Sequence, residues 1–315
     1  MARCLVTGGA GFIGSNLVAE LIRLGETVRI LDNFSTGKRE NLIPYRNLIE
    51  IIEGDIRSYH IVRESVSGID FVFHQAALPS VPRSIKDPIT TNEVNVGGTL
   101  NVLDAALNAG IKRVVFASSS SIYGDSEVLP KIETMNPSPL SPYATSKLAG
   151  EKYCQVFSKI YGLETVSLRY FNVFGPKQNP HSQYSAVIPL FIEQMKGDKQ
   201  PVVFGDGLQS RDFTHVSNVI QANILASRTP GVSGEVFNVA SGMSYTIIDL
   251  IDAINRELSK KIKPIFAKSR PADAKHSLAD INKAIQKLSY NPMIQFHEGL
   301  HQLIHQDQED MGIGR

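Results

Sequence analysis

The sequence is poor in cysteine, and this limits its covalent and metal chemistry. Only Cys4 and Cys154 occur among 315 residues, and neither has a CxxC neighbour or a His-rich partner segment. Two buried thiols in a reducing compartment are therefore expected, rather than a disulfide framework. No metal site is indicated by these cysteines.

The chain also lacks an excess of charge, a signal peptide and a long apolar run. Lys and Arg number 32 against 31 Asp and Glu, for a formal net charge of +1. This balance does not indicate a nucleic-acid-binding surface. The N-terminus enters a strand-like run directly, and no apolar stretch reaches the length of a membrane span. A cytoplasmic protein without membrane or nucleic-acid partners is the expectation.

What is present is the composition of an ordinary globular protein, with 42% hydrophobic and 20% charged residues. Short β-rich runs, apolar on both faces, alternate with helical stretches. Such alternation is typical of an α/β protein with a Rossmann-type, doubly wound parallel sheet. The expected strands are Arg3–Thr7, Thr27–Leu31, Leu48–Ile52, Asp70–His74, Lys112–Ala117 and Glu164–Arg169. The expected helices lie near Phe12–Leu24, Val96–Ala109 and Tyr143–Tyr161.

The alternation weakens after Phe174, where Pro, Gly and mixed segments become frequent. We therefore expect a dinucleotide-binding domain over residues 1–174 and a smaller C-terminal α/β lobe over residues 175–315. The lobe is expected over the carboxyl ends of the strands, where such sheets bind ligands. Later segments are expected to cross back to the sheet.

Three glycines follow the first expected strand and lead into a helix. Gly8, Gly11 and Gly14 would let the backbone turn tightly and approach a pyrophosphate at the helix N-terminus. Asp32 ends the next strand about 20 residues on, where a carboxylate binds ribose hydroxyls and disfavours a 2′-phosphate. NAD is therefore predicted over NADP, although Lys38 and the neighbouring Arg39 oppose that choice. The alternative is a surface aspartate with glycines that only pack a helix.

A second constellation is Tyr143 and Lys147, in SPYATSK. On a helix these residues share a face, and a Lys ammonium favours the phenolate, which could act as a base on a sugar hydroxyl. The spacing alone is weak, because about every second chain of this Tyr content would show it by chance. The serine run Ser118–Ser121 after the fifth strand adds a hydroxyl that could bridge substrate and tyrosine. A polar strand-to-loop turn is the alternative for that run.

Together these motifs resemble the extended short-chain dehydrogenases, and within them the UDP-sugar 4-epimerases. The resemblance rests on TGGAGFIGS, LDNFSTG, GDI, HQAA, NVGGTLN, SSSSIYGD, SPYATSK, LRYFNVFGP, SRDFTHV and FNVASG, in this order from Thr7 to Gly242. A further match lies around Arg270–Asp280. It implies that Tyr143 is the base, that Lys147 assists it and that Ser119 supplies the bridging hydroxyl, with Ser120 as the neighbouring candidate.

The same resemblance implies two sets of binding residues. NAD is expected against Gly8, Gly11, Phe12, Ile13, Gly14, Asp32, Asn33, Ser35, Thr36, Gly37, Asp55, Ile56, Gln75, Ala76, Ala77, Asn95, Tyr143 and Lys147. The nucleotide-sugar is expected against Ser80, Ser119, Ser120, Tyr143, Asn172, Val187, Phe204, Arg211, Arg270, Asp273 and Ser277.

The resemblance also points to a reaction and a substrate. Relatives that dehydrate or decarboxylate carry an acid just after the hydroxyl residue, whereas Ser120 and Ser121 stand here. Epimerisation at C4, through a transient 4-keto sugar and tightly bound NAD, needs no such acid. Ser277 aligns with a residue beside the sugar's 2-substituent, where glucose-only members carry Tyr. A small Ser favours UDP-GlcNAc and UDP-GalNAc, with UDP-Glc and UDP-Gal as further substrates. Ala272 departs from the Gly that relatives usually have there.

Two alternatives stay open. A UDP-uronate 4-epimerase would need a cation facing the sugar carboxylate, and Arg83 is a candidate. A non-enzymatic dinucleotide-sensing protein is disfavoured because Tyr143 and Lys147 are both present. The family resemblance also implies a homodimer, through the helices near Val96–Ala109 and Tyr143–Tyr161.

Overall fold

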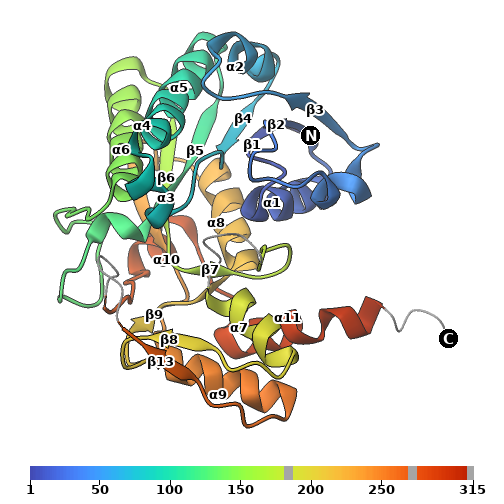
Figure 1. Ribbon diagram of the computed structural model, residues 1–315. Coiled ribbons are helices and arrows are strands. Elements are labelled where there is room, and N and C mark those ends of the chain that lie inside the picture. The colour runs from blue at the N-terminus through green and yellow to red at the C-terminus, as the bar shows by residue number, and fades with distance from the viewer. Residues whose placement is uncertain (181–186, 269–274, 311–315) are drawn as a thin grey trace.

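The computed structural model describes residues 1–180, 187–268 and 275–310, with side chains up to His305. Its centre is a seven-stranded parallel sheet in the order β11-β6-β5-β4-β1-β2-β3 (Figure 1). The strands of this sheet are β1 (Arg3–Thr7), β2 (Thr27–Asp32), β3 (Ile49–Glu53), β4 (Phe71–His74), β5 (Arg113–Ser119), β6 (Thr165–Tyr170) and β11 (Glu235–Val239). The six strands expected from the sequence are confirmed to within two residues at each end.

The order of the strands reverses between β1 and β4, which leaves a crevice at their carboxyl ends. Every neighbouring pair in the sheet is parallel, as a chain of strand–helix–strand units requires. Central strands are buried on both faces, β6 along its whole length. The doubly wound Rossmann-type fold is therefore confirmed.

Helices cover both faces of the sheet. One core joins the sheet to α1, α8 and α10, and a second joins its other face to α2, α5 and α6. The helices are α1 (Phe12–Arg23), α2 (Tyr59–Val66), α3 (Val81–Lys86), α4 (Pro88–Asn92), α5 (Gly98–Asn108), α6 (Pro142–Tyr161), α7 (Val187–Lys196), α8 (Val216–Arg228), α9 (Ile247–Leu258), α10 (Asn282–Leu288) and α11 (Phe296–Asp310). Two 3-10 turns, η1 (Arg39–Tyr45) and η3 (Ser120–Tyr123), and a π-turn, η2 (Glu93–Gly97), complete them.

A smaller lobe lies below the sheet in Figure 1, with its own apolar core between α7, α9 and α11. It carries three two-stranded sheets: β7 (Val173–Phe174) with β10 (Thr214–His215), β9 (Ser210–Arg211) with β12 (Tyr245–Thr246), and β8 (Val202–Phe204) with β13 (Ile265–Ala267). Because α8, β11 and α10 return to the large sheet, a cut at residue 174 does not separate the two parts. In the part of the chain described, no helix is long and apolar enough to cross a bilayer.

Helix α6 is fixed at both ends by its sequence. The Ser141 hydroxyl accepts a hydrogen bond from the Ala144 amide at 3.2 Å, and Pro142 takes the first turn, where no amide donor is needed. Gly162 ends the helix in the left-handed conformation, with φ of 74°. Tyr143 and Lys147 therefore start the helix at the carboxyl edge of the sheet.

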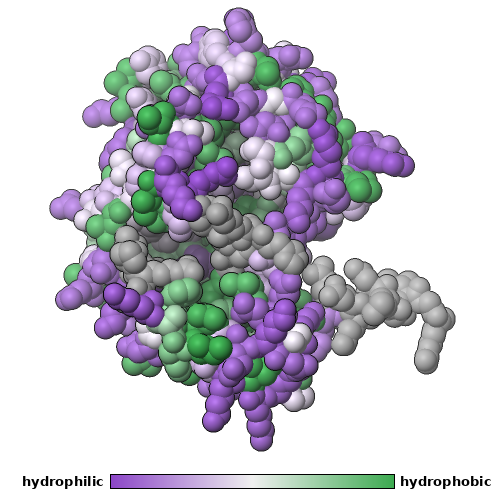
Figure 2. Space-filling view, in the orientation of Figure 1, coloured by the Kyte–Doolittle hydropathy of each residue, from purple (hydrophilic) through white to green (hydrophobic). Residues whose placement is uncertain are grey.

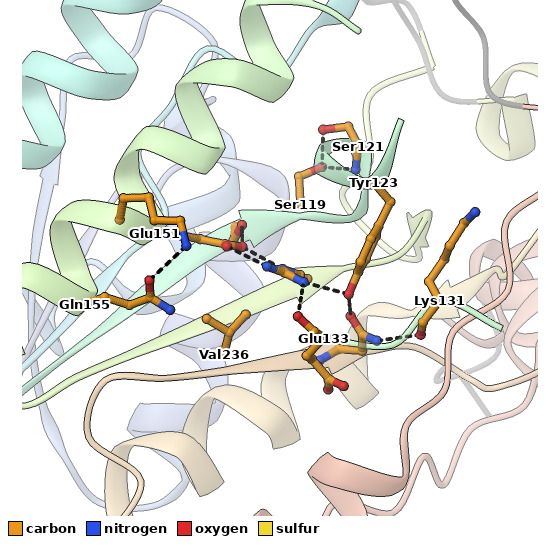
Figure 3. Close-up of polar contacts among 12 residues, drawn as sticks. Ser119, Ser121, Tyr123, Lys131, Glu133, Glu151, Gln155 and Val236 are labelled. Atoms are coloured by element: carbon orange, nitrogen blue, oxygen red, sulfur yellow. Dashed lines mark hydrogen bonds and ion pairs between the residues drawn. The ribbon is translucent and has the colours of Figure 1, made fainter. Parts of the chain in front are cut away.

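A buried ion pair ties α6 to the sheet. Glu151 of α6 and Arg169 of β6 make two parallel hydrogen bonds of 2.9 Å each. Glu151 also accepts a 2.5 Å hydrogen bond from Ser118, and Arg169 donates to the Tyr123 hydroxyl at 2.8 Å. Tyr123 donates in turn to Asn238 of β11 at 2.7 Å, so one network joins β5, β6, α6 and β11 (Figure 3).

Replacement of Arg169 by Leu should lower the free energy of unfolding by about 3–5 kcal/mol, because Glu151 would be left charged and buried. The matched control is Arg23→Leu, since Arg23 pairs with Glu20 at a position where its own side chain is 70% exposed. That control should change stability by less than about 1 kcal/mol. Urea unfolding followed by circular dichroism measures both, and equal losses would contradict the assignment.

Candidate active site

A cavity of about 1030 Å³ lies at the carboxyl ends of the strands, between the sheet and the small lobe. The space-filling view shows the molecule hollowed between its upper and lower parts (Figure 2). The cavity extends from the glycine turn after β1 to the loops of the small lobe, so its size suits a dinucleotide beside a second ligand.

The glycine turn forms one wall because side chains are impossible there. Gly8 has φ of 70°, and a Cβ on it would lie 2.7 Å from the Ala76 amide nitrogen. A Cβ on Gly14 would lie 2.1 Å from the carbonyl oxygen of Gly8. The turn, the start of α1 and the loop after β4 can therefore pack this closely only with glycine, which leaves bare backbone facing the cavity.

Asp32 lies at the end of β2, buried beside this turn. Its carboxylate accepts hydrogen bonds from the amides of Ala10, at 2.9 Å, and Phe34, at 2.8 Å. Burial raises the pKa of Asp32, while these two bonds act in the opposite direction. Both oxygens have a free lone pair, so the carboxylate can hold the turn and still accept from a ligand on the cavity side.

The predicted cofactor residues fall into two groups, those that line the cavity and those that do not. Those that line the cavity are Gly8, Gly11, Phe12, Ile13, Gly14, Asp32, Asn33, Ser35, Thr36, Asp55, Ile56, Gln75, Ala76, Ala77, Tyr143 and Lys147. Gly37 and Asn95 are not among the lining residues. A Cβ on Gly37 would lie 2.8 Å from that of Ala10, so this glycine packs behind the loop.

Asn95 supports the cavity wall rather than facing the cavity. It lies buried in the π-turn η2, where its side-chain oxygen accepts from the Leu78 amide at 2.8 Å and its nitrogen donates to Ser146 at 3.0 Å. It thus links the loop after β4 to α6. A direct contact of Asn95 with the cofactor stays a prediction.

His74, at the end of β4, also supports the cavity wall. The sequence analysis included it only within the HQAA motif. Its ring lies between the hydroxyls of Thr7, at 2.7 Å from Nδ1, and Thr99, at 3.0 Å from Nε2. Burial lowers the pKa of His74 to about 3, and the charge of Lys147 acts in the same direction. His74 is therefore neutral. Because the Thr99 hydroxyl gives its only proton to the Asn95 carbonyl, His74 must be the donor in the Nε2–Thr99 hydrogen bond.

Tyr143, Lys147 and Ser119 meet on the same wall of the cavity. Lys147 is buried and donates to the carbonyl oxygen of Ala117 at 2.8 Å, and burial lowers its pKa to about 8. Burial raises the pKa of the half-buried Tyr143, and a hydrogen bond with Ser119 partly offsets this. The protein alone therefore does not place the phenol near neutrality, contrary to the simple expectation from a nearby lysine.

The serines of the run Ser118–Ser121 have different hydrogen-bond partners. Ser118 lies at the cavity wall, and its hydroxyl donates to the buried Glu151 at 2.5 Å. Ser119 turns the other way, and its hydroxyl accepts from the amide and hydroxyl of Ser121, at 3.2 and 2.9 Å (Figure 3). Ser120 lines the cavity beside it. Of the two bridging candidates, the contact with Tyr143 belongs to Ser119.

On the side of the small lobe, Asn172, Arg211 and Ser277 converge. The Asn172 amide lies 3.5 Å from the Ser277 hydroxyl, and Arg211 donates to the carbonyls of Ser210 and Lys275, at 2.9 and 3.2 Å. All three line the cavity, as do Ser80 and Arg83. Val187 and Phe204 do not, and Arg270 and Asp273 lie outside the described residues.

Lys177 is a lining residue that the sequence analysis missed. It follows the LRYFNVFGP motif with φ of 68°, and its ammonium lies 3.4 Å from the Ser15 carbonyl of α1 and 3.5 Å from that of Asn41. Only its place just after the motif could have indicated it, because the fold brings it to α1 across more than 160 residues.

Comparisons with known proteins show which family this chain resembles. A curated relative, a putative UDP-glucose 4-epimerase of Methanocaldococcus jannaschii, is 37% identical over 302 residues, which cover 95% of this chain and 96% of that protein. The solved UDP-N-acetylglucosamine 4-epimerase from Methanobrevibacter ruminantium M1, in complex with UDP-N-acetylmuramic acid, has a TM-score of 0.93 and 42% identity, and covers 98% of this chain and 99% of that one.

A third relative is a variant of UDP-glucuronic acid 4-epimerase from Bacillus cereus, in complex with a fluorinated UDP-glucuronic acid and NAD. It has a TM-score of 0.90 and 33% identity, and covers 98% of this chain and 99% of that one. Residues 4–240 match the family model described as the NAD dependent epimerase/dehydratase family. The chain belongs to the NAD-dependent epimerase/dehydratase family.

Proposed function

We propose that this protein interconverts UDP-GlcNAc and UDP-GalNAc by reversible oxidation at C4 of the sugar. The relatives support a UDP-sugar 4-epimerase, and the choice of N-acetylhexosamine is our own step beyond that. The observation that carries it is that Ser119, Tyr143 and the small Ser277 line one cavity. UDP-Glc and UDP-Gal fit the same cavity, because an open site rejects a smaller substrate only weakly.

The distribution of acids supports epimerisation over dehydration or decarboxylation. Among the described residues, the carboxylates that line the cavity are Asp32 and Asp55, which follow β2 and β3. Both strands lie on the side of β1 away from β5, whereas Ser119 and Tyr143 lie at β5 and α6. A general acid beside the sugar is therefore lacking on this wall, and epimerisation needs none.

The residues present fit NAD. The bare backbone at Gly8 and Gly14 leaves room for a pyrophosphate at the start of α1, and Asp32 can accept from the ribose hydroxyls. When bound there, NAD would supply reversible hydride acceptance for the sugar carbon and a positive charge beside the phenol. Lys147, protonated below a pH of about 8, adds a second positive charge to the same wall.

The chain's own groups handle the proton and the position of the sugar. Tyr143 accepts the proton of the sugar O4 hydroxyl as the C4–H bond breaks, and gives it back when the 4-keto sugar is reduced. The Ser119 hydroxyl, held by Ser121, bridges the same oxygen to the phenol. The sugar must turn over between the two half-reactions, so it is held mainly through its diphosphate.

Arg211 and Asn172 are the groups proposed to hold that diphosphate. Arg211 lines the cavity and donates to two backbone carbonyls, and a forked guanidinium is the donor whose geometry best matches phosphate oxygens. Asn172 lies beside it, near Ser277. Binding by the diphosphate leaves the sugar free to present either face.

A UDP-uronate is the second candidate substrate, because Arg83 lines the cavity. Its guanidinium makes no hydrogen bond or ion pair within the described part of the chain. Arg83 stands one turn after Ser80 on α3, where its charge could meet a sugar carboxylate. A preference for UDP-glucuronate over UDP-GlcNAc would favour this candidate.

We also propose that the protein forms a homodimer through α5 and α6. The solvent-facing side of α6 exposes Val156, Ile160 and Tyr161, an apolar row unusual for a surface helix.

Gly8→Ala should lose bound NAD, because its Cβ would meet the Ala76 backbone and displace the turn. The control is Gly25→Ala: Gly25 also has positive φ, of 78°, but a Cβ there meets nothing within 4 Å. Both variants carry similar backbone strain, so only the first should lose the cofactor. NAD released from purified protein, measured per chain, checks this. Equal NAD content would remove Gly8 from the cofactor site.

Tyr143→Phe should keep NAD bound but lower the turnover number by roughly 100-fold or more, the usual contribution of a general base. Tyr153→Phe is the control, because Tyr153 lies on the same helix but packs against the apolar core and does not line the cavity. Its turnover should be unchanged. A Tyr143→Phe enzyme with near-normal turnover would assign the base elsewhere.

Ser277→Tyr should lower kcat/KM for UDP-GlcNAc at least about tenfold relative to UDP-Glc, because the phenol would fill the space proposed for the N-acetyl group. Ser277→Ala keeps that space open and should retain both activities. Chromatography of wild type and variants with UDP-GlcNAc, UDP-Glc and UDP-glucuronate gives the ratios. If wild type converts neither of the first two, the proposed function is wrong.

A further inference from the structure

Outside the cavity, three side chains that can ligate a metal meet between α9 and α11. Glu257 lies in the last turn of α9, and His301 and His305 lie on α11. One ligand atom from each lies within 4.8 Å of the other two. Among the described residues, no other group of three His, Cys, Asp or Glu side chains lies this close together. The proposed reaction does not use these three residues.

The two histidines share one face of α11 because they are four residues apart. Their ring centroids are 4.6 Å apart. The same helix buries Leu300 and Ile304 against Ile251 and Ile254 of α9, in the apolar core of the small lobe. The backbone positions of the three ligands are therefore set by packing before any ion arrives, which lowers the cost of ordering them.

The distances approach those of a tetrahedral site. His305 Nε2 lies 3.3 Å from Glu257 Oε2, and His301 Nδ1 lies 2.7 Å from the same oxygen. Two ligands about 2.0–2.1 Å from zinc at a tetrahedral angle lie about 3.3 Å apart. The first separation already matches, and the second needs to open by only about 0.6 Å, which side-chain rotation can supply.

The surroundings allow an ion to enter. Glu257 and His305 are about a quarter exposed, and His301 is 62% exposed. The three side chains therefore lie on the open side of the helix pair, where water can complete a coordination shell.

We propose that Glu257, His301 and His305 bind one divalent transition-metal ion of the zinc class, completed by water, which clamps the last helix to α9. Two imidazoles with one carboxylate suit zinc, nickel or copper and not magnesium or calcium, which prefer oxygen ligands. The H-x-x-x-H pattern is visible in the sequence, but the third ligand lies 44 residues earlier than His301 and only the fold brings it there.

The clamp would stiffen the lobe that carries part of the cavity. Helix α9 begins directly after β12, and β12 pairs with β9, which contains Arg211. A metal bound at the C-terminal end of α9 would join α9 to α11 and so oppose the separation of α11 from the lobe. It would not contact the cavity. Binding only to the folded form also raises Tm.

The test is a calorimetric titration of zinc chloride into untagged full-length protein, with thermal unfolding at saturating zinc. Wild type should bind one zinc per chain and show a raised Tm. His301→Gln and Glu257→Gln should each weaken binding at least about tenfold and lose the rise in Tm. The control is His60→Gln, an exposed histidine on α2, which should behave as wild type. Magnesium chloride should produce no rise.

The outcomes separate a metal site from a plain ion pair. If zinc binds the two ligand variants as tightly as wild type, or binds wild type with no rise in Tm, the proposal is overturned and the cluster is a hydrogen-bonded pair only. Circular dichroism shows that the variants are folded. Cobalt in place of zinc adds a spectroscopic check, because visible absorption typical of imidazole-bound tetrahedral cobalt should appear in wild type and not in His301→Gln. None of these readouts depends on epimerase activity.

Discussion

The proposed active site depends on the contact between one face of α6 and the last three residues of β5. Tyr143, Lys147 and Glu151 follow each other at intervals of one helical turn. Lys147 donates to the Ala117 carbonyl, and Glu151 accepts from Ser118. These two bonds align the helix with the strand end, so the phenol at the top of the helix reaches the next residue, Ser119. The buried ion pair between Glu151 and Arg169 keeps this alignment fixed.

The same constraint explains why the protein keeps charge in its interior. A buried ion pair contributes little net stability, but removing one partner is costly, so the pair favours one arrangement of helix and strand over others. Arg169 extends that arrangement to Tyr123 and, through Asn238, to β11. A strand that arrives late in the chain is thereby held to the edge of the sheet beside the site.

Sequence periodicity was enough for the first six strands and for the glycine turn, because both depend on residues close together in the chain. The seventh strand, β11 (Glu235–Val239), was not predicted, because it lies beyond Phe174, where the regular alternation of strand and helix patterns weakens. The different partners of Ser118 and Ser119 were also not predicted. Successive side chains of a strand project to opposite sides, so Ser118 bonds to Glu151 and Ser119 to Ser121. Asn95 was predicted from the resemblance as a cofactor residue, and its hydrogen bonds to Leu78 and Ser146 could not be predicted, because they join residues 17 and 51 positions away.

Electrostatics of the cavity could not be read from composition either. The chain as a whole is almost neutral, yet the described residues that line the cavity include seven cations and two carboxylates. Folding gathers Lys38, Arg57, Arg83, Lys131, Lys147, Lys177 and Arg211 at this place. NAD and a UDP-sugar each carry a diphosphate, and a cleft of one sign concentrates ligands of the other. Because Asp32 and Asp55 follow β2 and β3, no lining carboxylate of the described residues lies beside Tyr143. In the proposed reaction, positive charge from Lys147 and from bound NAD would favour the phenolate, which burial of the tyrosine disfavours.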